Sequence, residues 1–293
     1  MTNSRFVVTR RDLVRGTFAA VLGSGIAHTL EAQGTVRPSR SSTVILVRDE
    51  KALSAGGKVD PAVLKQMLTE VLMRVTGQKS EKDAWLSLVK PSDVIGVVPT
   101  PHLNATHKEV IDAVKASLVN AGIPAPQIRN AQGGPEQPRA CNSLIPLPAL
   151  KAHWLTGIGT VLKNYITFSG NPSSYHDANN AKLGEIWKMP HVRGKTRLVL
   201  VDALRPLCDK GPQPDPRYLW NYNGLIAGTD PVAVEAVCLK IITERRKALR
   251  GEPWPLSPPP LCVVMADEKY ELGTSRLNEI KIERVGWTQD VLV

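Results

Sequence analysis

Short apolar runs alternate along this chain with capped, amphipathic helix patterns, and this alternation limits the possible folds more than any other feature. Runs typical of buried strands occur at 43–49, 93–98, 144–147, 196–202 and 224–228. Helix patterns occur between them, at 60–77, 106–122 and 230–249. Strands that alternate with helices predict an α/β fold, in which a mixed or largely parallel sheet is flanked by helices within a single domain.

The segment 60–77 carries the clearest helix pattern. Asp60 can cap its start, Pro61 suits its first turn and Gly77 suits its end. Apolar residues at helical spacing predict one buried face, made of Val63, Leu64, Met67, Leu68, Val71, Leu72 and Val75.

Two further helix starts show capping signals. Thr106 and Glu109 have the spacing of a capping box, and Gly122 follows the end of that segment. Asp230 followed by Pro231 predicts the start of the helix at 230–249.

The first thirty residues are typical of an export signal. Arg10 and Arg11 precede a weakly apolar run at about 16–30, and the twin arginines in "TRRDLV" favour the twin-arginine route. A membrane anchor is the alternative, but the run is short and contains two glycines and a histidine, so it spans a bilayer poorly.

We therefore divide the chain into an export signal at 1–32, a linker at 33–42 and an α/β domain at 43–293. The twin-arginine machinery is the expected partner, and the expected location is periplasmic or extracellular. Cleavage near Ala32 would leave no stable membrane anchor. "LEA" is an imperfect exit motif, so retention as an anchor stays open. The proline-rich segment 251–260 is interpreted as a surface connection, because too little chain follows it for a second core.

The chain is basic, with a formal net charge of +10. The charges are scattered, no long Lys/Arg block occurs and few aromatics lie among them, so nucleic-acid binding is not expected. A surplus of this kind is compatible with a small anionic ligand or with an ordinary solvated basic surface.

Motifs of several cofactor and enzyme classes are missing from the sequence. The four cysteines form no CxxC pair, so neither a zinc ribbon nor an iron–sulfur cluster has its usual ligand set. No Walker loop, no GxGxxG after a strand and no GxSxG elbow occurs. In an oxidising compartment one or two disulfides are possible, with three full pairings open, and Cys238 is expected to be a buried small apolar residue.

Residues 151–177 contain more hydrogen-bonding side chains than a core requires, and we take four of them as candidate catalytic residues: Lys151, His153, Lys163 and His176. Ligands of open α/β sheets bind beyond the carboxyl ends of the strands, and the first two of these residues follow the strand-like run 144–147. Lys163 and Asn164 have apolar neighbours in "TVLKNYITF", and a partly buried lysine needs an anion or acquires a shifted pKa.

Asn164, Asp202 and Asp230 are the candidate ligand-binding residues. Asp202 ends the strand-like run 196–202, where a cap or a turn explains it equally well. Asp230 follows another such run, but Asp–Pro at a helix start is explained more simply as a helix cap. In the functional reading the lysines neutralise an anion, a histidine exchanges a proton, and the aspartates orient these groups or hold a metal. The cofactor is unknown. A metal stays open, although the chain has no HxxxH or HxH spacing; His102 and His107 are weaker candidates.

Several motifs together resemble one known family. "LIPLPALKAHWLTGIGTVLKN", "NPSSYHD", "LVLVDALRPLCDKGPQP" and "WNYNGLIAGTDPVAVEAV" resemble, in order and spacing, the domain of unknown function 362 family. The resemblance covers about 90–286 and implies that the seven candidate residues correspond to the family's polar motif positions. It implies export for members with a twin-arginine signal, but no reaction. Some relatives carry ferredoxin-type cysteine clusters, which this chain lacks.

The chain departs from the family pattern at three places. Val98 and Thr100 stand where the family's strand often ends in Lys-x-Asn. The stretch between "IRNAQGGP" and "CNSLIPL" is shorter than usual, and Glu235 stands where Asp is common. These departures would alter the choice of ligand or remove an activity.

Two functional hypotheses follow. The first is an exported protein that binds a small anionic ligand in a Lys/His/Asp crevice, with or without transforming it. The second is a non-catalytic ligand-binding or accessory protein of an exported redox system. Whether the protein is an enzyme is left open by the sequence.

Overall fold

The computed structural model describes residues 41–293 and contains two sheets. The predicted export signal and all but the last two residues of the predicted linker lie outside the described residues. The larger sheet has the strand order β6-β5-β7-β8-β1-β9. Its strands are β1 (Ser42–Arg48), β5 (Ala149–His153), β6 (Gly157–Ile158), β7 (Val199–Leu207), β8 (Gly224–Gly228) and β9 (Ile280–Gly286).

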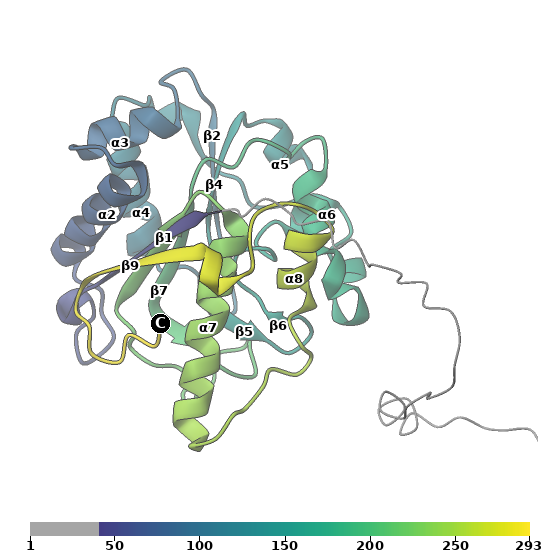
Figure 1. Ribbon diagram of the computed structural model, residues 1–293. Helices are drawn as coiled ribbons and strands as arrows, with labels where there is room; N and C mark the ends of the chain where they lie inside the picture. Colours follow the sequence, from purple (N-terminus) through teal and green to yellow (C-terminus); the bar gives the residue numbers. More distant parts are fainter. Residues whose placement is uncertain (1–40) are drawn as a thin grey trace, which may run out of the picture. The chain divides into compact units, whose positions relative to one another are not determined.

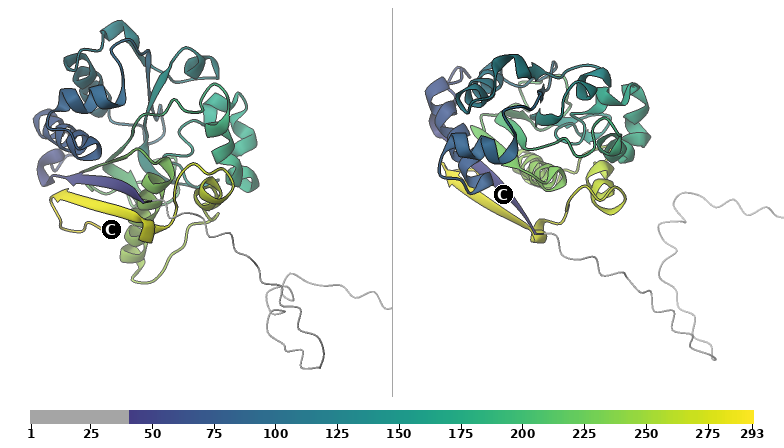
Figure 2. Two further views of the ribbon diagram at one scale, coloured as in Figure 1. Left: turned by 45° about the horizontal axis from the view of Figure 1, so that its top comes forward. Right: turned by 90° about the horizontal axis from the view of Figure 1, so that it is seen from above.

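The larger sheet is mixed. β5 pairs with β7 and β1 pairs with β9 in parallel, whereas the β5–β6, β7–β8 and β1–β8 pairs are antiparallel. The last strand of the chain, β9, therefore lies beside the first described strand, β1, as both views of Figure 2 show.

The smaller sheet is parallel throughout, with the order β3-β2-β4. Its strands are β2 (Ile95–Pro99), β3 (Ile128–Asn130) and β4 (Ser143–Leu147). A parallel bridge between Leu144 and Thr196 links β4 to the chain entering β7. A mixed sheet and a parallel sheet flanked by helices confirm the predicted α/β single-domain fold.

Helices cover both faces of the larger sheet (Figure 1). α2, α3 and α4 lie on one face, and α7 lies on the other, with α6 and α8 next to it. The helices are α2 (Pro61–Thr76), α3 (Glu81–Leu88), α4 (Lys108–Asn120), α5 (Glu136–Arg139), α6 (Leu183–Lys188), α7 (Pro231–Arg250) and α8 (Leu261–Glu268). Within residues 41–293, none of these helices is both long and apolar enough to cross a membrane.

The core has two halves, one on each face of the larger sheet. Along β1, Val44 and Leu46 pack into the half that includes α7, whereas Ile45 and Val47 pack into the half that includes α2 and α4. Successive side chains of a strand point to opposite faces, so an apolar run without alternation is needed when helices cover both faces. This is why the middle of β1, at 44–47, is an unbroken apolar run.

Two of the predicted helix starts are confirmed in detail. The Asp60 carboxylate accepts hydrogen bonds from the amides of Ala62 and Val63, and Asp230 does the same for Val232 and Ala233. The predicted end of α2 is also confirmed, because Gly77 adopts a left-handed conformation with φ 69°.

The predicted capping box at Thr106 is wrong. The first turn of α4 begins after His107, and no side chain caps it. The Thr106 hydroxyl instead donates to the Leu147 carbonyl at 2.6 Å and accepts from the Thr100 amide at 2.9 Å. It therefore joins the ends of β2 and β4 rather than the first turn of the helix.

Two strand boundaries also differ from the prediction. β7 covers 199–207 rather than 196–202, so Asp202 lies inside the strand. β7 continues because its second half pairs with β5, at Lys151 and Leu207. Lys151 and His153, which were expected to follow β4 after a short turn, do follow it and belong to a strand of their own, β5. At the start of the domain, β1 begins at Ser42, the last residue of the predicted linker.

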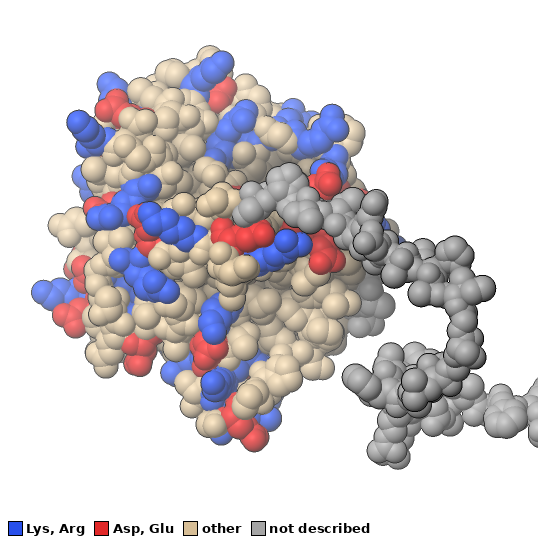
Figure 3. All heavy atoms as spheres, in the orientation of Figure 1, with Lys and Arg blue, Asp and Glu red and all other residues tan. Residues whose placement is uncertain are grey.

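All four cysteines are buried and free, and the buried position of Cys238 is as predicted. On the face shown in Figure 3, lysines and arginines are mixed with aspartates and glutamates instead of forming a patch of one sign. The segment 251–260 has no regular structure, as expected for a connection between α7 and α8.

Candidate functional site

A pocket of about 340 Å³ lies beyond the carboxyl ends of β2, β3 and β5. This is the position at which open α/β sheets bind ligands. Its lining comes from the last residues of β2 and β5, from the segments that follow β2, β3 and β7, and from the loop between β6 and α6. The lining residues are Val98, Pro99, Thr100, Pro101, His102, Leu103, Gln132, Gly133, Lys151, His153, Gly159, Lys163, Asn164, Ile166, Thr167, Pro172, His176 and Pro212.

Five of the seven candidate residues line this pocket: Lys151, His153, Lys163, Asn164 and His176. β5 presents the first two on the same side because they are two residues apart in a strand. The chain then folds back along β5, so that the Gly159 amide donates to the Lys151 carbonyl at 2.9 Å. This return brings the turn that carries Lys163 and Asn164 to the pocket.

Gly159 allows the close approach between this turn and β5. A Cβ atom at position 159 would lie 3.0 Å from the His153 Cβ and 3.1 Å from its ring carbon Cδ2. Any other residue would therefore press on the imidazole, so the glycine helps to fix where the His153 ring lies.

Lys151 is almost completely buried. Its ammonium donates to the Leu103 carbonyl at 2.7 Å and to the Asn104 carbonyl at 3.2 Å. Burial, and then the nearby charge of Lys163, lowers its pKa to about 7. The two carbonyls hold the amine in place and leave one of its three hydrogens for another acceptor.

Lys163 has no hydrogen-bond acceptor for its amine within residues 41–293. Burial lowers its pKa to about 8. Its charge also lowers the pKa of Lys151, His153 and His176. Lys163 is thus the one group in the pocket that acts electrostatically on the other three titratable candidates.

The two histidines stack on each other. Their ring centroids are 5.7 Å apart and the planes make an angle of 18°. Nδ1 of His153 accepts a hydrogen bond from the Leu155 amide at 3.1 Å, which places the ring proton on Nε2. Burial, and then the charge of Lys163, lowers the pKa of His153 to about 3, so this ring is neutral at physiological pH. The pKa of His176 is lowered by the same two causes.

Asn164 adds an unpaired polar atom to the pocket. Its side-chain Oδ1 is buried and has no hydrogen-bond partner among the described residues. A buried amide oxygen without a partner is costly, and a ligand that donates a hydrogen bond would satisfy it.

No aspartate or glutamate is among the residues that line this pocket in the described part of the chain. The polar lining consists of amines, imidazoles, amides and hydroxyls, and its two lysines and three histidines carry positive charge when protonated. Between residues 41 and 293, no group of three or more His, Cys, Asp and Glu side chains is arranged to hold a metal ion. The geometry favours an anion as the occupant.

Asp202 and Asp230 do not line the pocket. The Asp202 carboxylate accepts from the backbone amide and from the ring Nδ1 of His107, both at 2.7 Å, and from the Leu204 amide. It lies inside β7 and ties that strand to the start of α4.

The Asp230 carboxylate is occupied by four donors: two amides of α7, the Ser42 hydroxyl at 2.6 Å and the Thr274 amide at 3.0 Å. Asp230 therefore does not lie in the crevice, where a ligand-binding residue was expected. It caps α7, which is the alternative that the sequence offered.

Three residues that line the pocket were weak candidates, or no candidates, for the site when the sequence alone was considered: His102, Gln132 and Thr100. His102 was a weak candidate, because nothing in a lone histidine marks it for a pocket. Gln132 follows β3, whose three residues are too short to show a pattern. Val98 and Thr100 both line the pocket. The departure of the chain from the Lys-x-Asn pattern at these two positions therefore falls within the pocket lining.

Glu235, the third departure from the family pattern, does not line the pocket but contacts the turn that carries Lys163. Its side chain is fully buried, and Oε2 accepts a hydrogen bond from the Val161 amide at 2.7 Å, in the turn that carries Lys163. Its Oε1 has no partner among the described residues. Burial raises the pKa of this carboxyl to about 7.

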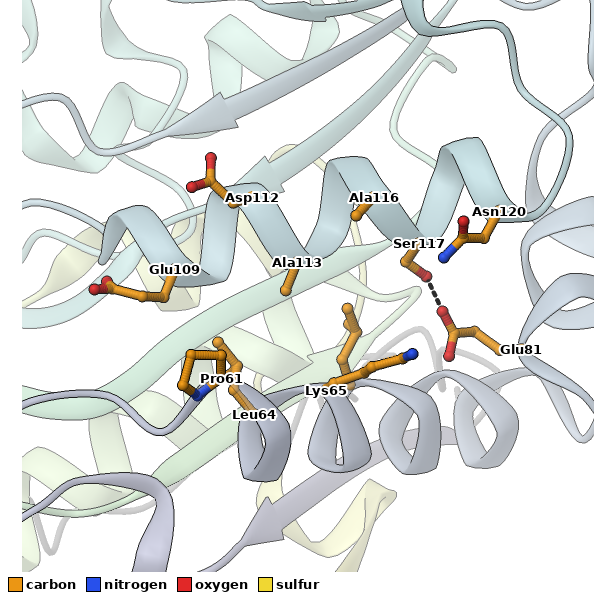
Figure 4. Close-up of a pocket in the computed structure, with 11 residues that line it drawn as sticks. Pro61, Leu64, Lys65, Glu81, Glu109, Asp112, Ala113, Ala116, Ser117 and Asn120 are labelled. Carbon is orange, nitrogen blue, oxygen red and sulfur yellow. Dashed lines mark hydrogen bonds between the residues drawn. The ribbon is translucent and has the colours of Figure 1, made fainter.

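A second pocket, of about 370 Å³, lies between α2 and α4 (Figure 4). Leu64, Leu68, Ala113 and Ala116 give it mainly apolar walls. Ser117 donates a hydrogen bond to Glu81 across it, and Asp112 pairs with Lys108. Among the described residues that line it, none has an unpaired buried polar atom, so it gives a weaker indication of a ligand than the pocket around Lys163.

One segment of the chain is matched in the comparisons with known proteins, and it contains all seven candidate residues as well as Glu235. Searches of curated proteins and of solved structures give no match. Residues 135–240 match the model of the family described as Domain of unknown function (DUF362), which confirms the family that the sequence motifs predicted.

Proposed function

We propose that the protein binds a small anionic ligand in the pocket around Lys163. The observation that carries the proposal is the composition of the lining: two lysines and three histidines converge there, and no carboxylate accompanies them among the lining residues that the structure describes. Buried cations without a paired anion are costly, and the lowered pKa values of Lys151 and Lys163 reflect that cost. A bound anion would offset it.

The pocket also suits a ligand with more than charge. Its volume of about 340 Å³ lies in the range of small-molecule sites. Val98, Leu103 and Ile166 supply apolar surface, and the unpaired Oδ1 of Asn164 can accept a hydrogen bond. We propose a ligand that combines an anionic group, a hydrogen-bond donor and a short apolar part.

We also propose that this binding takes place after export. The support is the twin-arginine pattern of the first 32 residues. Fusing residues 1–40 to a reporter that is active only outside the cytoplasm tests this. We expect the reporter to be active, and we expect this activity to be lost when Arg10 and Arg11 are changed to lysine. An inactive fusion, or full activity of the double-lysine variant, would contradict export by the twin-arginine route.

Lys163→Met tests the binding proposal. Because the amine of Lys163 has no acceptor within the described chain, methionine removes a buried cation without leaving an unpaired carbonyl. We expect the affinity for oxalate or inorganic phosphate, measured by calorimetry, to fall by about tenfold or more. We expect the melting temperature to stay equal or rise, because a buried charge is removed.

Lys90→Met is the matched control, since this lysine lies on the exposed surface. It should change neither the affinity nor the melting temperature. If the unmodified protein binds neither probe, or if Lys163→Met binds both as well as the unmodified protein does, the proposal is wrong.

A further inference from the structure

We propose that Lys163 is a nucleophilic amine that forms an imine with an aldehyde or ketone carrying an anionic group, which Lys151 holds beside it. This inference rests on the proposed function, because the anionic group brings the carbonyl compound into the pocket. It adds a covalent step and a substrate class.

The two lysines differ in a way that assigns them different roles. The Lys151 ammonium already donates to two backbone carbonyls, at 2.7 and 3.2 Å, and such acceptors favour its charged form. Lys163 has no acceptor for its amine in the described structure, although it lines the same pocket. Without an anion Lys151 has the lower pKa of the two, about 7 against about 8 for Lys163. Its two carbonyl acceptors and a bound anion both favour the ammonium form, so Lys151 is suited to hold an anion. Lys163 has a free lone pair once it loses its proton.

The surroundings of Lys163 favour the loss of that proton. The amine is largely buried, it shares the pocket with the Lys151 amine, and no carboxylate among the described lining residues stabilises its charge. A lysine that is desolvated and next to another cationic group is the recognised arrangement for amine nucleophiles. The lowered pKa of Lys163, about 8, is consistent with this arrangement.

The reaction balances without an oxidant or reductant. The neutral amine attacks the carbonyl carbon, and a C–N bond forms while the carbonyl π electrons move to oxygen. A proton passes from nitrogen to that oxygen and gives a carbinolamine. The hydroxyl then leaves with a second proton as water, and the nitrogen lone pair completes the C=N bond.

The histidine pair is placed to assist these proton transfers. The neutral ring of His153 carries its proton on Nε2, because Nδ1 accepts from the Leu155 amide. It can therefore donate a hydrogen bond to the oxygen that gains charge during the attack. His176, stacked on His153 and only partly buried, can exchange the proton that leaves with water.

Reductive trapping tests the inference. The purified protein is incubated with pyruvate or with dihydroxyacetone phosphate, treated with borohydride, digested and analysed by mass spectrometry. Borohydride adds hydride to the C=N bond and makes the adduct permanent. We expect at least tenfold more adduct at Lys163 than at exposed lysines such as Lys90, and we expect oxalate to compete. The two probes distinguish a carboxylate from a phosphate as the preferred anionic group.

Two controls separate this inference from the proposed function. Lys163→Arg keeps a positive charge but has no nucleophilic amine, so it should still bind oxalate while trapping at this position is lost. Lactate carries a carboxylate but no aldehyde or ketone group, so it should bind without forming an adduct. Oxalate binding with no preferential adduct at Lys163 from either probe overturns the imine and leaves anion binding standing. Absence of both binding and trapping overturns the two proposals together.

Discussion

The buried carboxylate of Glu235, in the first turns of α7, accepts a hydrogen bond from the backbone amide of Val161 at 2.7 Å. Val161 lies two residues before Lys163, so this bond connects a central helix directly to the turn that supplies the reactive amine. Glu235 makes the connection at a cost, because it is fully buried and its other oxygen has no partner among residues 41–293.

Glu235 should therefore make the stability of the protein depend on pH. Burial raises its pKa from about 4.5 to about 7, while the nearby thiols of Cys238 and Cys262 have raised pKa values and stay neutral. A folded-state pKa above the unfolded value means that the folded state binds more protons between these values. The free energy of unfolding should then fall by on the order of 3 kcal/mol as the pH rises from about 4.5 to 7.

Urea unfolding of Glu235→Gln between pH 5 and 8 checks this prediction. Glutamine has the same shape and keeps an oxygen for the Val161 amide, but it does not titrate. We expect the pH profile of the variant to be flatter over this range than that of the unmodified protein. Parallel profiles for the two proteins would show that Glu235 is not the titrating group.

Anion binding should weaken as the pH rises. The lowered pKa values of Lys151 and Lys163, about 7 and about 8, mean that both amines are charged only on the acid side of this range. An anion binds the charged forms best, so affinity for oxalate should be highest below pH 7 and should fall through pH 8. Between these values, binding should take up protons.

Calorimetry in buffers of different ionisation enthalpy measures this proton uptake directly. Imine trapping should show the opposite trend, because it needs the neutral amine of Lys163 and should become faster as the pH approaches 8. An oxalate affinity that does not change between pH 6 and 9 would exclude both lysines from anion binding.

Much of the fold could be predicted because its signals are local. The caps at Asp60 and Asp230, the glycine at 77 and the apolar periods of α2 and α7 all lie within a few residues of the structure that they determine. Pairing between distant segments has no such signal. The extension of β7 to Leu207 depends on β5, and β9 lies beside a strand more than 200 residues earlier in the chain.

The candidate site divides in the same way. The five residues between Lys151 and His176 come from one stretch of chain, and a surplus of polar groups in that stretch marked them before the structure did. The position of Asp202 outside the pocket could not be predicted in this way. Its partner, His107, is 95 residues away in sequence, and neither residue indicates the other. Glu235 was noticed only as a departure from the family, and its contact with Val161 spans 74 residues.

Asp202 should prove necessary for stability and dispensable for anion binding. Its carboxylate holds the amide and ring of His107 at the start of α4. Burial lowers the pKa of His107, but the hydrogen bond and charge of Asp202 outweigh this effect and raise it overall. Stability gained from a raised histidine pKa is fully present below about pH 6.5 and is lost as the pH rises through the folded value.

Asp202→Asn should therefore lower the free energy of unfolding by roughly 1–3 kcal/mol at pH 6, and by less at pH 9. Urea unfolding at the two pH values measures this. Asp112→Asn is the control, since Asp112 forms an exposed ion pair with Lys108 whose loss should hardly change the free energy of unfolding. Oxalate affinity at a temperature where the variant is folded should match that of the unmodified protein. A tenfold loss of affinity in folded Asp202→Asn would instead make this carboxylate part of the binding site, as its position in the sequence first indicated.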